Sequence, residues 1–404
     1  MAISPRILLA AGGTGGHIAP ALALAEALEE LDPSCHIGCV TGAKPFESSM
    51  YRAAGRDPLI LGGQPVVVTS PVKLAKALIG GTSAFVRALG LLKREKPHVV
   101  VGMGGYVAAP VALAARMLRI PVYLHEQNAT AGRSNRLLAR LASHTSAAYL
   151  SALCELRSRR RTRIGNPLPR ALYAVTRDEG LDLFGLEADR PVLLVVGGSQ
   201  GARRLNELVF EAGKWMQGIF PAEVMPQILW ATGDGEFARW QARLDAEPEL
   251  ARIFKPQPFI ARMPAAYACA DLAITRAGAG TLAELAALGV PSILVPYPHA
   301  RDDHQTLNGR SFTDAGAAIM VQEANLKSED LGSLIGRLLA QPRTLLRMSM
   351  RAQSLATPDA GHQMAEIVLH LAHGYRERFL PARREAAPDS ARRMSLPAAL
   401  GSNS

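Results

Sequence analysis

Short apolar runs alternate with helix-like segments along most of this chain, and this alternation limits the folds that it can adopt. RILLAAGG (6–13) precedes the helical pattern APALALAEALEEL, and HVVVGMGG (98–105) precedes APVALAARMLR. After residue 190 the alternation begins again with PVLLVVGGSQG and ARRLNELVFEAG. Apolar strands joined through helices form parallel sheets that are covered on both faces. The sequence therefore predicts an α/β fold with two doubly wound domains.

The length of 404 residues agrees with two domains, because single cores stop growing at about 250 to 300 residues. We place the first domain at residues 1–168 and the second at residues 169–375, with a last helix that can cross back to the first. The arginine-rich stretch RSRRRTR (157–163) lies close to this boundary. Residues 376–404 lack periodicity, and we assign them to a disordered basic tail.

The composition is that of an ordinary globular protein, with 48% hydrophobic and 20% charged residues. No apolar run is long enough for a signal peptide or a membrane span, so neither is expected. The four cysteines form no CxxC pair, which indicates buried thiols in a reducing compartment. The net charge of +10 fits an anionic membrane surface or a polyanionic substrate. Nucleic acid is not expected, because no binding motif accompanies the charge.

Three glycine-rich loops, at 12–17, 102–106 and 197–202, follow predicted strands and open predicted helices. Such a loop places backbone N–H groups at the positive end of a helix dipole, which suits a diphosphate. None is a Walker loop or a GxGxxG followed by the acidic residue of dinucleotide sites. No DxD pair occurs, so no metal site is expected. One such loop could be only a tight turn, but three loops in two domains indicate an anionic ligand in the cleft between them.

The segment 275–309 adds polar side chains to the second domain. Arg276 precedes a glycine turn, and we place Glu284 in the first turn of the helix that begins TLAEL. Glu284 is either an acid favoured by the helix dipole or a carboxylate that accepts the hydroxyls of a ribose. The polar run HARDDHQTLN (299–308) follows a buried strand, so we expect it to line the cleft.

Six segments carry a resemblance to a known family: GGTGGHIAPALALAEAL, GGYVAAPVALAA, HEQNATAGRSNRLLAR, VVGGSQGARRLNE, RAGAGTLAELAALGVPSILVPYP and DDHQTLN. In their order and combination they resemble the MurG family of bacterial peptidoglycan glycosyltransferases. The resemblance implies a GT-B fold of two Rossmann-like domains and no cofactor. It implies transfer of GlcNAc from UDP-GlcNAc to the C4 hydroxyl of the MurNAc of lipid I, with inversion, to form lipid II. It also implies a peripheral location on the cytoplasmic face of the inner membrane, with other cell-wall synthesis proteins as further partners.

The resemblance assigns most of the donor site to the second domain. The residues that it assigns to the donor are Ser199, Gln200, Ile260, Arg276, Gly280, Thr281, Glu284, Gln305 and Asn308. Ser199 and Gln200, in the third glycine loop, would lie near the phosphates. Arg276 and the glycine turn after it would flank the diphosphate. Ile260 would lie beside the uracil and Glu284 on the ribose, while Gln305 and Asn308 would reach the sugar.

The resemblance assigns the acceptor side to the first domain. The residues that would close over the GlcNAc are Thr14, Gly15, Gly16 and Asn128, and the acceptor-side candidates are His17, Tyr106, His125 and Glu126. The family's GNPVR reads GNPLPR here, so the matching arginine, Arg170, falls one position late. This departure puts its contact with the donor in doubt.

His17 and Glu126 are the two candidates for a catalytic base. A histidine at a helix N-terminus has its pKa lowered by the dipole, which favours the neutral imidazole that can take a proton. The structural alternatives are that His17 only caps its helix, and that His125 and Glu126 only brace the HEQN turn.

Residues 70–96 alternate apolar and basic side chains, as in a helix that lies on an anionic membrane surface. The apolar residues are Leu74, Leu78, Phe85, Leu89 and Leu92, and the basic ones are Lys73, Lys76, Arg87, Lys93, Arg94 and Lys96. A helix that packs on its own sheet would explain the leucines equally well, and the basic excess favours the membrane.

Three other classes of protein remain alternatives at this point. A UDP-GlcNAc 2-epimerase shares the GT-B shape but needs no acceptor motifs such as GGYV and HEQN. A nicotinamide oxidoreductase would need the GxGxxG pattern with its acidic residue. A non-catalytic protein that binds membrane surfaces would not need the residues of the cleft.

Overall fold

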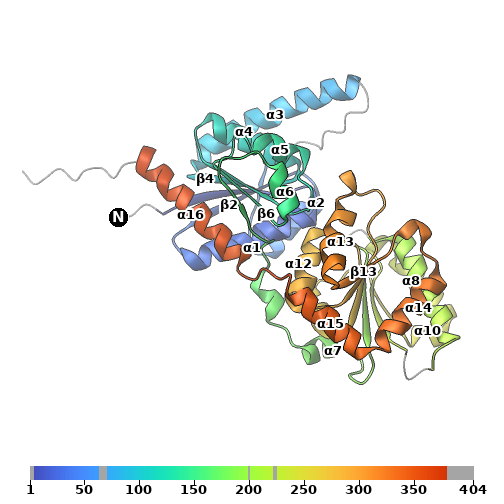
Figure 1. The fold of residues 1–404 in the computed structure, drawn as a ribbon. Coiled ribbons are helices and arrows are strands. Elements are labelled where there is room, and N and C mark those ends of the chain that lie inside the picture. Colours follow the sequence, from blue (N-terminus) through green and yellow to red (C-terminus); the bar gives the residue numbers. More distant parts are fainter. Residues whose placement is uncertain (1–3, 63–70, 199–200, 222–224, 380–404) are drawn as a thin grey trace, which may run out of the picture.

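The computed structural model describes residues 4–62, 71–198, 201–221 and 225–379, with the backbone alone at 71–81 and 376–379. These residues form two sheets, one in each half of the chain (Figure 1). The N-terminal sheet has the order β3-β2-β1-β4-β5-β6-β7 and comprises β1 (Arg6–Ala10), β2 (His36–Thr41), β3 (Leu59–Ile60), β4 (Val99–Gly102), β5 (Val122–Glu126), β6 (His144–Ala147) and β7 (Arg161–Arg163).

The C-terminal sheet has the order β10-β9-β8-β11-β12-β13. It comprises β8 (Val192–Val196), β9 (Gln227–Ala231), β10 (Phe254–Gln257), β11 (Leu272–Thr275), β12 (Ser292–Leu294) and β13 (Ala318–Met320). The paired strands of both sheets run parallel. The predicted α/β class with two doubly wound domains is confirmed.

Helices cover both faces of each sheet (Figure 1). In the first half they are α1 (Gly15–Leu31), α2 (Pro45–Ala53), α3 (Pro71–Glu95), α4 (Gly105–Met117), α5 (Arg133–Leu138) and α6 (Leu150–Glu155). After a 3₁₀ turn, η1 (Arg170–Tyr173), they are α7 (Arg177–Phe184), α8 (Arg203–Gln217), α9 (Asp234–Ala246), α10 (Pro248–Ala251), α11 (Met263–Cys269), α12 (Ala279–Leu288), α13 (His304–Ala315), α14 (Ser328–Leu339), α15 (Pro342–Gln353) and α16 (Ala360–Phe379). Two further 3₁₀ turns are η3 (Arg301–Asp303) and η4 (Glu323–Asn325).

Strand β1 shows why the strands read as continuous apolar runs. Ile7 and Leu9 point to one face of the sheet and pack in a cluster with α1 and α16. Leu8 and Ala10 point to the other face and pack in a second cluster with α3 and α4. Because successive side chains of a strand alternate between faces, a strand that is covered on both faces must be apolar at every position.

Helix α16 returns to the first domain and lies along α1, beside the N-terminal sheet (Figure 1). Met364, Ala365 and Val368 are buried in the same cluster as Ile7. The N-terminal sheet ends at β7 and the C-terminal sheet begins at β8, so the boundary placed at 168/169 falls between them. The assignment of a disordered tail from residue 376 is wrong for residues 376–379, which complete α16, and residues 380–404 lie outside the described part of the chain.

The stretch RSRRRTR, which we placed near the domain boundary, contributes β7, the edge strand that pairs with β6. Arg161 and Arg163 are exposed there. Charged side chains on an edge strand oppose pairing with another chain. The arginines therefore suit the place that the stretch takes in the sheet.

Both sheets reverse their strand order next to a glycine loop. In the first sheet β1 and β4 are neighbours, and in the second sheet β8 and β11 are neighbours. Ligands of open α/β sheets bind where the connections from two such neighbouring strands diverge. The loops at 12–17 and 102–106 leave the first of these points, and those at 197–202 and 276–281 leave the second.

Candidate active site

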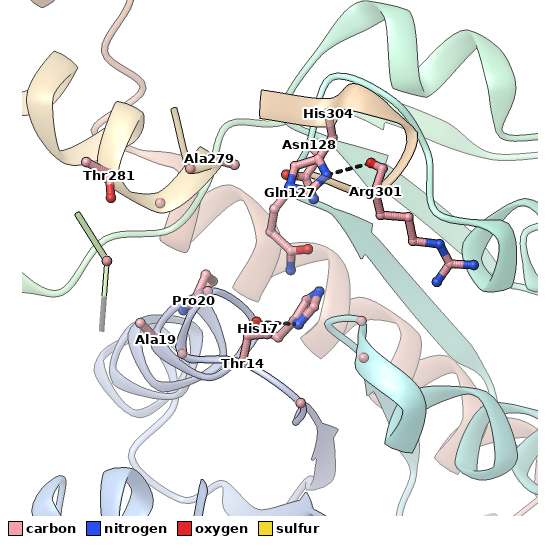
Figure 2. Close-up of a pocket in the computed structure, with 18 of the residues that line it drawn as sticks. Thr14, His17, Ala19, Pro20, Gln127, Asn128, Ala279, Thr281, Arg301 and His304 are labelled. Carbon is pink, nitrogen blue, oxygen red and sulfur yellow. Dashed lines mark hydrogen bonds between the residues drawn. The ribbon is translucent and has the colours of Figure 1, made fainter. Parts of the chain in front are cut away.

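One large cavity, of about 2410 Å³, is lined by loops of both domains. This volume exceeds the roughly 300–1,000 Å³ of common small-molecule pockets, so the cavity has room for two substrates. Figure 2 shows Thr14, the N-cap residue of α1, and His17 of α1 on one side, with Ala279 and Thr281 of α12 across the gap. The cavity therefore lies where the switch points of the two sheets meet.

His17 is the third residue of α1 and stands on the N-terminal wall of the cavity. Its Nδ1 hydrogen-bonds with Thr14 Oγ1 at 3.0 Å (Figure 2). Burial lowers the pKa of His17, against the opposing effect of the Glu126 carboxylate. The ring lies against Gly104, where a Cβ would come within 2.6 Å of the imidazole. The imidazole is therefore neutral near pH 7 and held between a hydroxyl and a glycine.

Tyr106 lines the same wall but cannot serve as a base. Its hydroxyl donates to Glu47 Oε1 at 3.2 Å. Burial and the neighbouring Glu47 carboxylate raise the pKa of Tyr106 to about 12. Its ring lies 3.5 Å from where a Cβ of Gly13 would stand, so it covers the first glycine loop.

His125 does not reach the cavity. Its side chain is 0% exposed, with Nδ1 at 2.8 Å from Ser146 Oγ and Nε2 at 3.1 Å from Asn166 Oδ1. Burial lowers its pKa to about 4. A neutral ring that is bonded at both nitrogens favours the alternative given for His125, in which it braces the HEQN turn.

Glu126 lines the cavity, but its carboxylate is occupied by protein donors. Oε1 accepts from the backbone N–H and the side-chain amide of Asn128, at 3.1 and 3.2 Å. Oε2 accepts from Gly132 N at 2.9 Å and from Asn135 Nδ2 at 2.8 Å. A carboxylate that holds four N–H groups in a turn would have to release one of them to act as a base. The geometry favours His17 over Glu126 for that role.

Asn308 joins the two domains instead of facing open space. It is fully buried; its Oδ1 accepts from Ala129 N at 2.7 Å, and its Nδ2 donates to Asn128 Oδ1 and Ala277 O, both at 3.1 Å. The amide of Asn308 is thus bonded to protein groups of both domains, and its contact with the sugar stays a prediction. Asn166 makes a second link between the domains. Its Nδ2 donates to Gln127 O in the first domain and to Ala279 O in the second, at 3.3 Å each.

The C-terminal wall is built around the start of α12. Glu284 is the sixth residue of this helix, so its placement in the first turn is wrong by one turn. The hydroxyl of Tyr267 donates to Glu284 Oε2 at 2.8 Å, and burial raises the pKa of Glu284. Ile260 and Met263 line the cavity beside it. The wall thus combines an apolar surface, a carboxylate and a helix N-terminus.

Arg276 lines the cavity, and its charge is paired. Its guanidinium donates to Glu323 Oε1 at 2.7 Å and to the carbonyl oxygens of Val295 and Pro296 at 3.0 and 3.3 Å. Gln305 also lines the cavity, and its Oε1 accepts from Tyr297 N at 2.8 Å. Both side chains are therefore held in place by the loop that follows β12, and Arg276 also by Glu323 in the turn that follows β13.

Most of the residues predicted for the site do lie together on the cavity wall. They are Thr14, Gly15, Gly16, His17, Tyr106, Glu126, Asn128, Ile260, Arg276, Gly280, Thr281, Glu284 and Gln305. Arg170 does not join them, because its exposed side chain pairs with Glu30 on α1 at 2.7 Å. Its contact with the donor stays a prediction. Ser199 and Gln200 lie outside the described residues.

Comparison with known families gives an independent result. The model "Glycosyltransferase family 28 N-terminal domain" matches residues 7–146, and "Glycosyltransferase family 28 C-terminal domain" matches residues 192–364. A relative from Alkalilimnicola ehrlichii is named UDP-N-acetylglucosamine–N-acetylmuramyl-(pentapeptide) pyrophosphoryl-undecaprenol N-acetylglucosamine transferase. It is 41% identical over 374 residues, which cover 90% of this chain and 98% of the relative. A protein of the same name from Pseudomonas fluorescens is 38% identical, with 91% and 99% covered.

A crystal structure of Acinetobacter baumannii MurG superposes with a TM-score of 0.70 at 31% identity, covering 91% of this chain and 99% of that one. The chain belongs to the MurG family. A UDP-N-acetylglucosamine 2-epimerase also superposes, with a TM-score of 0.64 at 17% identity and with 93% and 98% covered. At that identity the likeness shows the shared GT-B fold alone. The predicted resemblance to the MurG glycosyltransferases is thus confirmed.

In this MurG family member the sequence motifs missed three side chains that organise the site: Glu47, Asn166 and Glu323. Each acts on a partner far away in the chain, since Glu47 accepts from Gly13 N and Glu323 from Arg276. The one available signal was local. Glu47 stands in the first turn of α2 after Pro45, which is typical of a helix cap.

The link made by Asn308 predicts an effect on stability. Asn308→Ala removes the acceptor of Ala129 N–H in a buried place, so the free energy of unfolding should fall by about 1–3 kcal/mol. Urea denaturation measures this change. Asn325→Ala, an exposed amide in the same domain, is the control and should change stability by less than about 0.5 kcal/mol. Equal effects of the two variants would contradict the link.

Proposed function

We propose that this MurG family member transfers GlcNAc from UDP-GlcNAc to the C4 hydroxyl of MurNAc in undecaprenyl-diphosphate-linked lipid I. The product is lipid II, and the anomeric carbon is inverted. The observation that carries the proposal is that His17 and the N-terminus of α12 line one cavity from its two sides (Figure 2). The names of the A. ehrlichii and P. fluorescens relatives support the same reaction.

The donor fits the C-terminal wall. Glu284 would accept the hydroxyls of the ribose, and Ile260 would give the uracil an apolar edge. The N–H groups from Gly278 to Thr281 stand at the positive end of α12, where they would meet the diphosphate. Thr14, Gly15 and Asn128, on the opposite wall, would then close over the GlcNAc.

His17 supplies the base that this reaction needs. The C4 oxygen of MurNAc attacks C1 of GlcNAc, and its proton passes to the neutral imidazole. The bond from C1 to the diphosphate oxygen breaks on the opposite side, and its electron pair leaves with UDP. The charge that develops on UDP is stabilised by the dipole of α12, because the guanidinium of Arg276 is already paired with Glu323.

We further propose that α3 docks the enzyme on an anionic membrane. Among the described residues no helix is both long and apolar enough to cross a bilayer. In Figure 1 the first turns of α3 project beyond the rest of the N-terminal domain. In α3 Val86 is 60% exposed, and Met117 at the end of α4, which packs against α3, is 68% exposed. These two helices thus expose apolar side chains in addition to the basic ones of the segment.

The second half of α3 corrects part of this expectation. Leu92 is buried, and Phe85 and Leu89 pack against the core that α3 shares with α4. These three side chains thus contribute to the packing of the domain, so the proposed membrane contact does not rest on them. The side chains described for α3 do not include those of Leu74, Leu78, Lys73 and Lys76. Arg87 is exposed. The membrane contact that we propose therefore rests on the first half of the helix and on the basic residues. It would place the enzyme on the cytoplasmic face of the inner membrane.

A single assay tests the proposed reaction. Labelled UDP-GlcNAc is incubated with the protein, with and without a lipid I analogue, and the products are separated. We expect UDP release and a labelled disaccharide only when the acceptor is present. An epimerised sugar nucleotide, UDP release without acceptor, or the absence of turnover would each contradict the proposal.

The role of His17 predicts a specific pH profile. Burial and His304 lower its pKa below 6.5, while Glu126 and Glu47 raise it by less. The base must be neutral, so the acidic limb of kcat/KM should lie below pH 6.5. His17→Asn keeps a polar group near Thr14 but removes the base, so the rate should fall by about 100-fold or more and the limb should disappear. Full activity in this variant would mean that His17 only caps α1.

Membrane docking predicts a loss of vesicle binding on charge neutralisation. Each basic residue near an anionic surface contributes about 1 kcal/mol, so Lys73→Gln, Lys76→Gln and Arg87→Gln together should weaken binding by about 100-fold. Cosedimentation with phosphatidylglycerol vesicles measures the affinity of each variant for the membrane. The control neutralises Lys327, Arg343 and Arg347, exposed residues of the C-terminal domain, and should leave binding nearly unchanged. Equal losses in both triple variants would reject α3 as the docking element.

A further inference from the structure

A buried carboxylate stands behind the N-terminal wall of the cavity. Glu47 is 0% exposed and accepts hydrogen bonds from four donors. Its Oε1 accepts from Gly13 N at 3.0 Å and from the hydroxyl of Tyr106 at 3.2 Å. Its Oε2 accepts from Thr41 Oγ1 at 2.9 Å and from Gly42 N at 2.7 Å.

The four donors come from the ends of three neighbouring strands. Gly13 follows β1, Thr41 and Gly42 lie at the end of β2, and Tyr106 follows β4. These strands lie side by side in the order β2-β1-β4. Glu47 is thus the common acceptor of three loops, two of which carry side chains of the cavity wall.

We infer that Glu47 is a positioning residue for glycosyl transfer: it fixes the loop that leads into His17 and the ring of Tyr106 that covers this loop. The inference rests on the proposed function, because it assumes that the acceptor meets this wall. Glu47 itself is absent from the residues that line the cavity, so it acts through these two elements. It differs from Glu126, which holds the HEQN turn.

The geometry requires a carboxylate and not merely a polar side chain of this size. Glutamine would offer one acceptor oxygen, and its NH₂ group would face either Gly13 N or Gly42 N. The hydroxyls of Thr41 and Tyr106 can turn and accept from that NH₂ group, but a backbone N–H cannot accept. Glu47→Gln therefore leaves one buried backbone donor facing another donor, while the volume of the side chain stays the same.

Capping of α2 is the structural alternative, but none of the four donors to Glu47 belongs to α2. The groups that act on the imidazole of His17 are Glu126, Glu47 and His304. The Glu47 carboxylate raises the pKa of His17, since it stabilises the imidazolium. Removing this charge lowers that pKa, so the acidic limb of kcat/KM moves to lower pH in Glu47→Gln. The same charge acts on His17 whichever role Glu47 has, so the exchange of the loop peptides described below, and not the limb, separates positioning from capping.

The experiment compares Glu47→Gln with the wild type and with Glu29→Gln, an exposed carboxylate of α1 that pairs with Arg56. We expect kcat/KM for a lipid I analogue to fall by about 100-fold in Glu47→Gln, as for a displacement of about 1 Å in an active site. The affinity for UDP, measured by calorimetry, should stay within about twofold, because the donor residues stand on the other domain. Glu29→Gln should match the wild type in both measurements.

Hydrogen exchange provides a measurement that needs no turnover. Peptides that cover 10–20 and 103–107 should exchange faster in Glu47→Gln, while peptides of α12 should not change. If the wild type shows no transfer, the proposed function fails, and these peptides still decide whether Glu47 holds the loops. Unchanged exchange at 10–20, wild-type kcat/KM, or an equal loss of UDP affinity would each overturn the inference.

A second variant keeps the inference testable if Glu47→Gln does not fold. Thr41 is fully buried and does not line the cavity, so its effect on transfer must pass through Glu47. Thr41→Val keeps the shape and removes one of the four donors. We expect kcat/KM to fall by about fivefold, the worth of one hydrogen bond, with UDP affinity unchanged. Wild-type transfer in this variant would contradict the role of the network.

Discussion

The contact of backbone with backbone at the carboxyl edge of the N-terminal sheet is the constraint on which the site depends. Gly105 lies against the carbonyl of Gly12 so closely that any Cβ there would overlap it. Gly104 lies against His17 in the same way, and both Gly104 and Gly105 have positive φ. These glycines let the loops after β1 and β4 touch each other. Only because they touch can the ring of Tyr106 cover the first loop.

The two domains are held together by polar groups that the cavity walls share. Asn166 and Asn308 each bond to the HEQN turn of the first domain and to the start of α12 or the loop before it. The acceptor-side turn and the donor-side helix are thus connected through side-chain amides with defined donors and acceptors. Buried amides of this kind favour one relative placement, because any other leaves them unpaired. The cavity volume follows from this placement.

The sequence was sufficient for the fold because its signals are local. The apolar runs of β1, β4, β8 and β11 are continuous, and each is followed by a glycine loop and a segment with helical periodicity. These local patterns were enough to predict the parallel sheets and the place of the cavity. The partners of side chains were not available in this way. Asn308 bonds to Ala129, 179 residues earlier, and Arg170 pairs with Glu30. The apolar period of α3 could not tell a core from a membrane, since both select the same spacing.

The charges of the cavity wall set how it can bind anions. The chain carries a net charge of +10, yet Arg276 is neutralised by Glu323, and Glu126 and Glu284 add carboxylates to the wall. A diphosphate there can meet backbone N–H groups at the starts of α1, α4 and α12 as well as the side chains of Arg203 and Arg204 at the start of α8. Each helix N-terminus contributes about 0.3–1 kcal/mol when exposed and up to about 2 kcal/mol when partly buried. Several of them act together with the arginines of the wall, among them Arg203 and Arg204 at the start of α8. The basic residues outside the cavity act at longer range on an anionic surface.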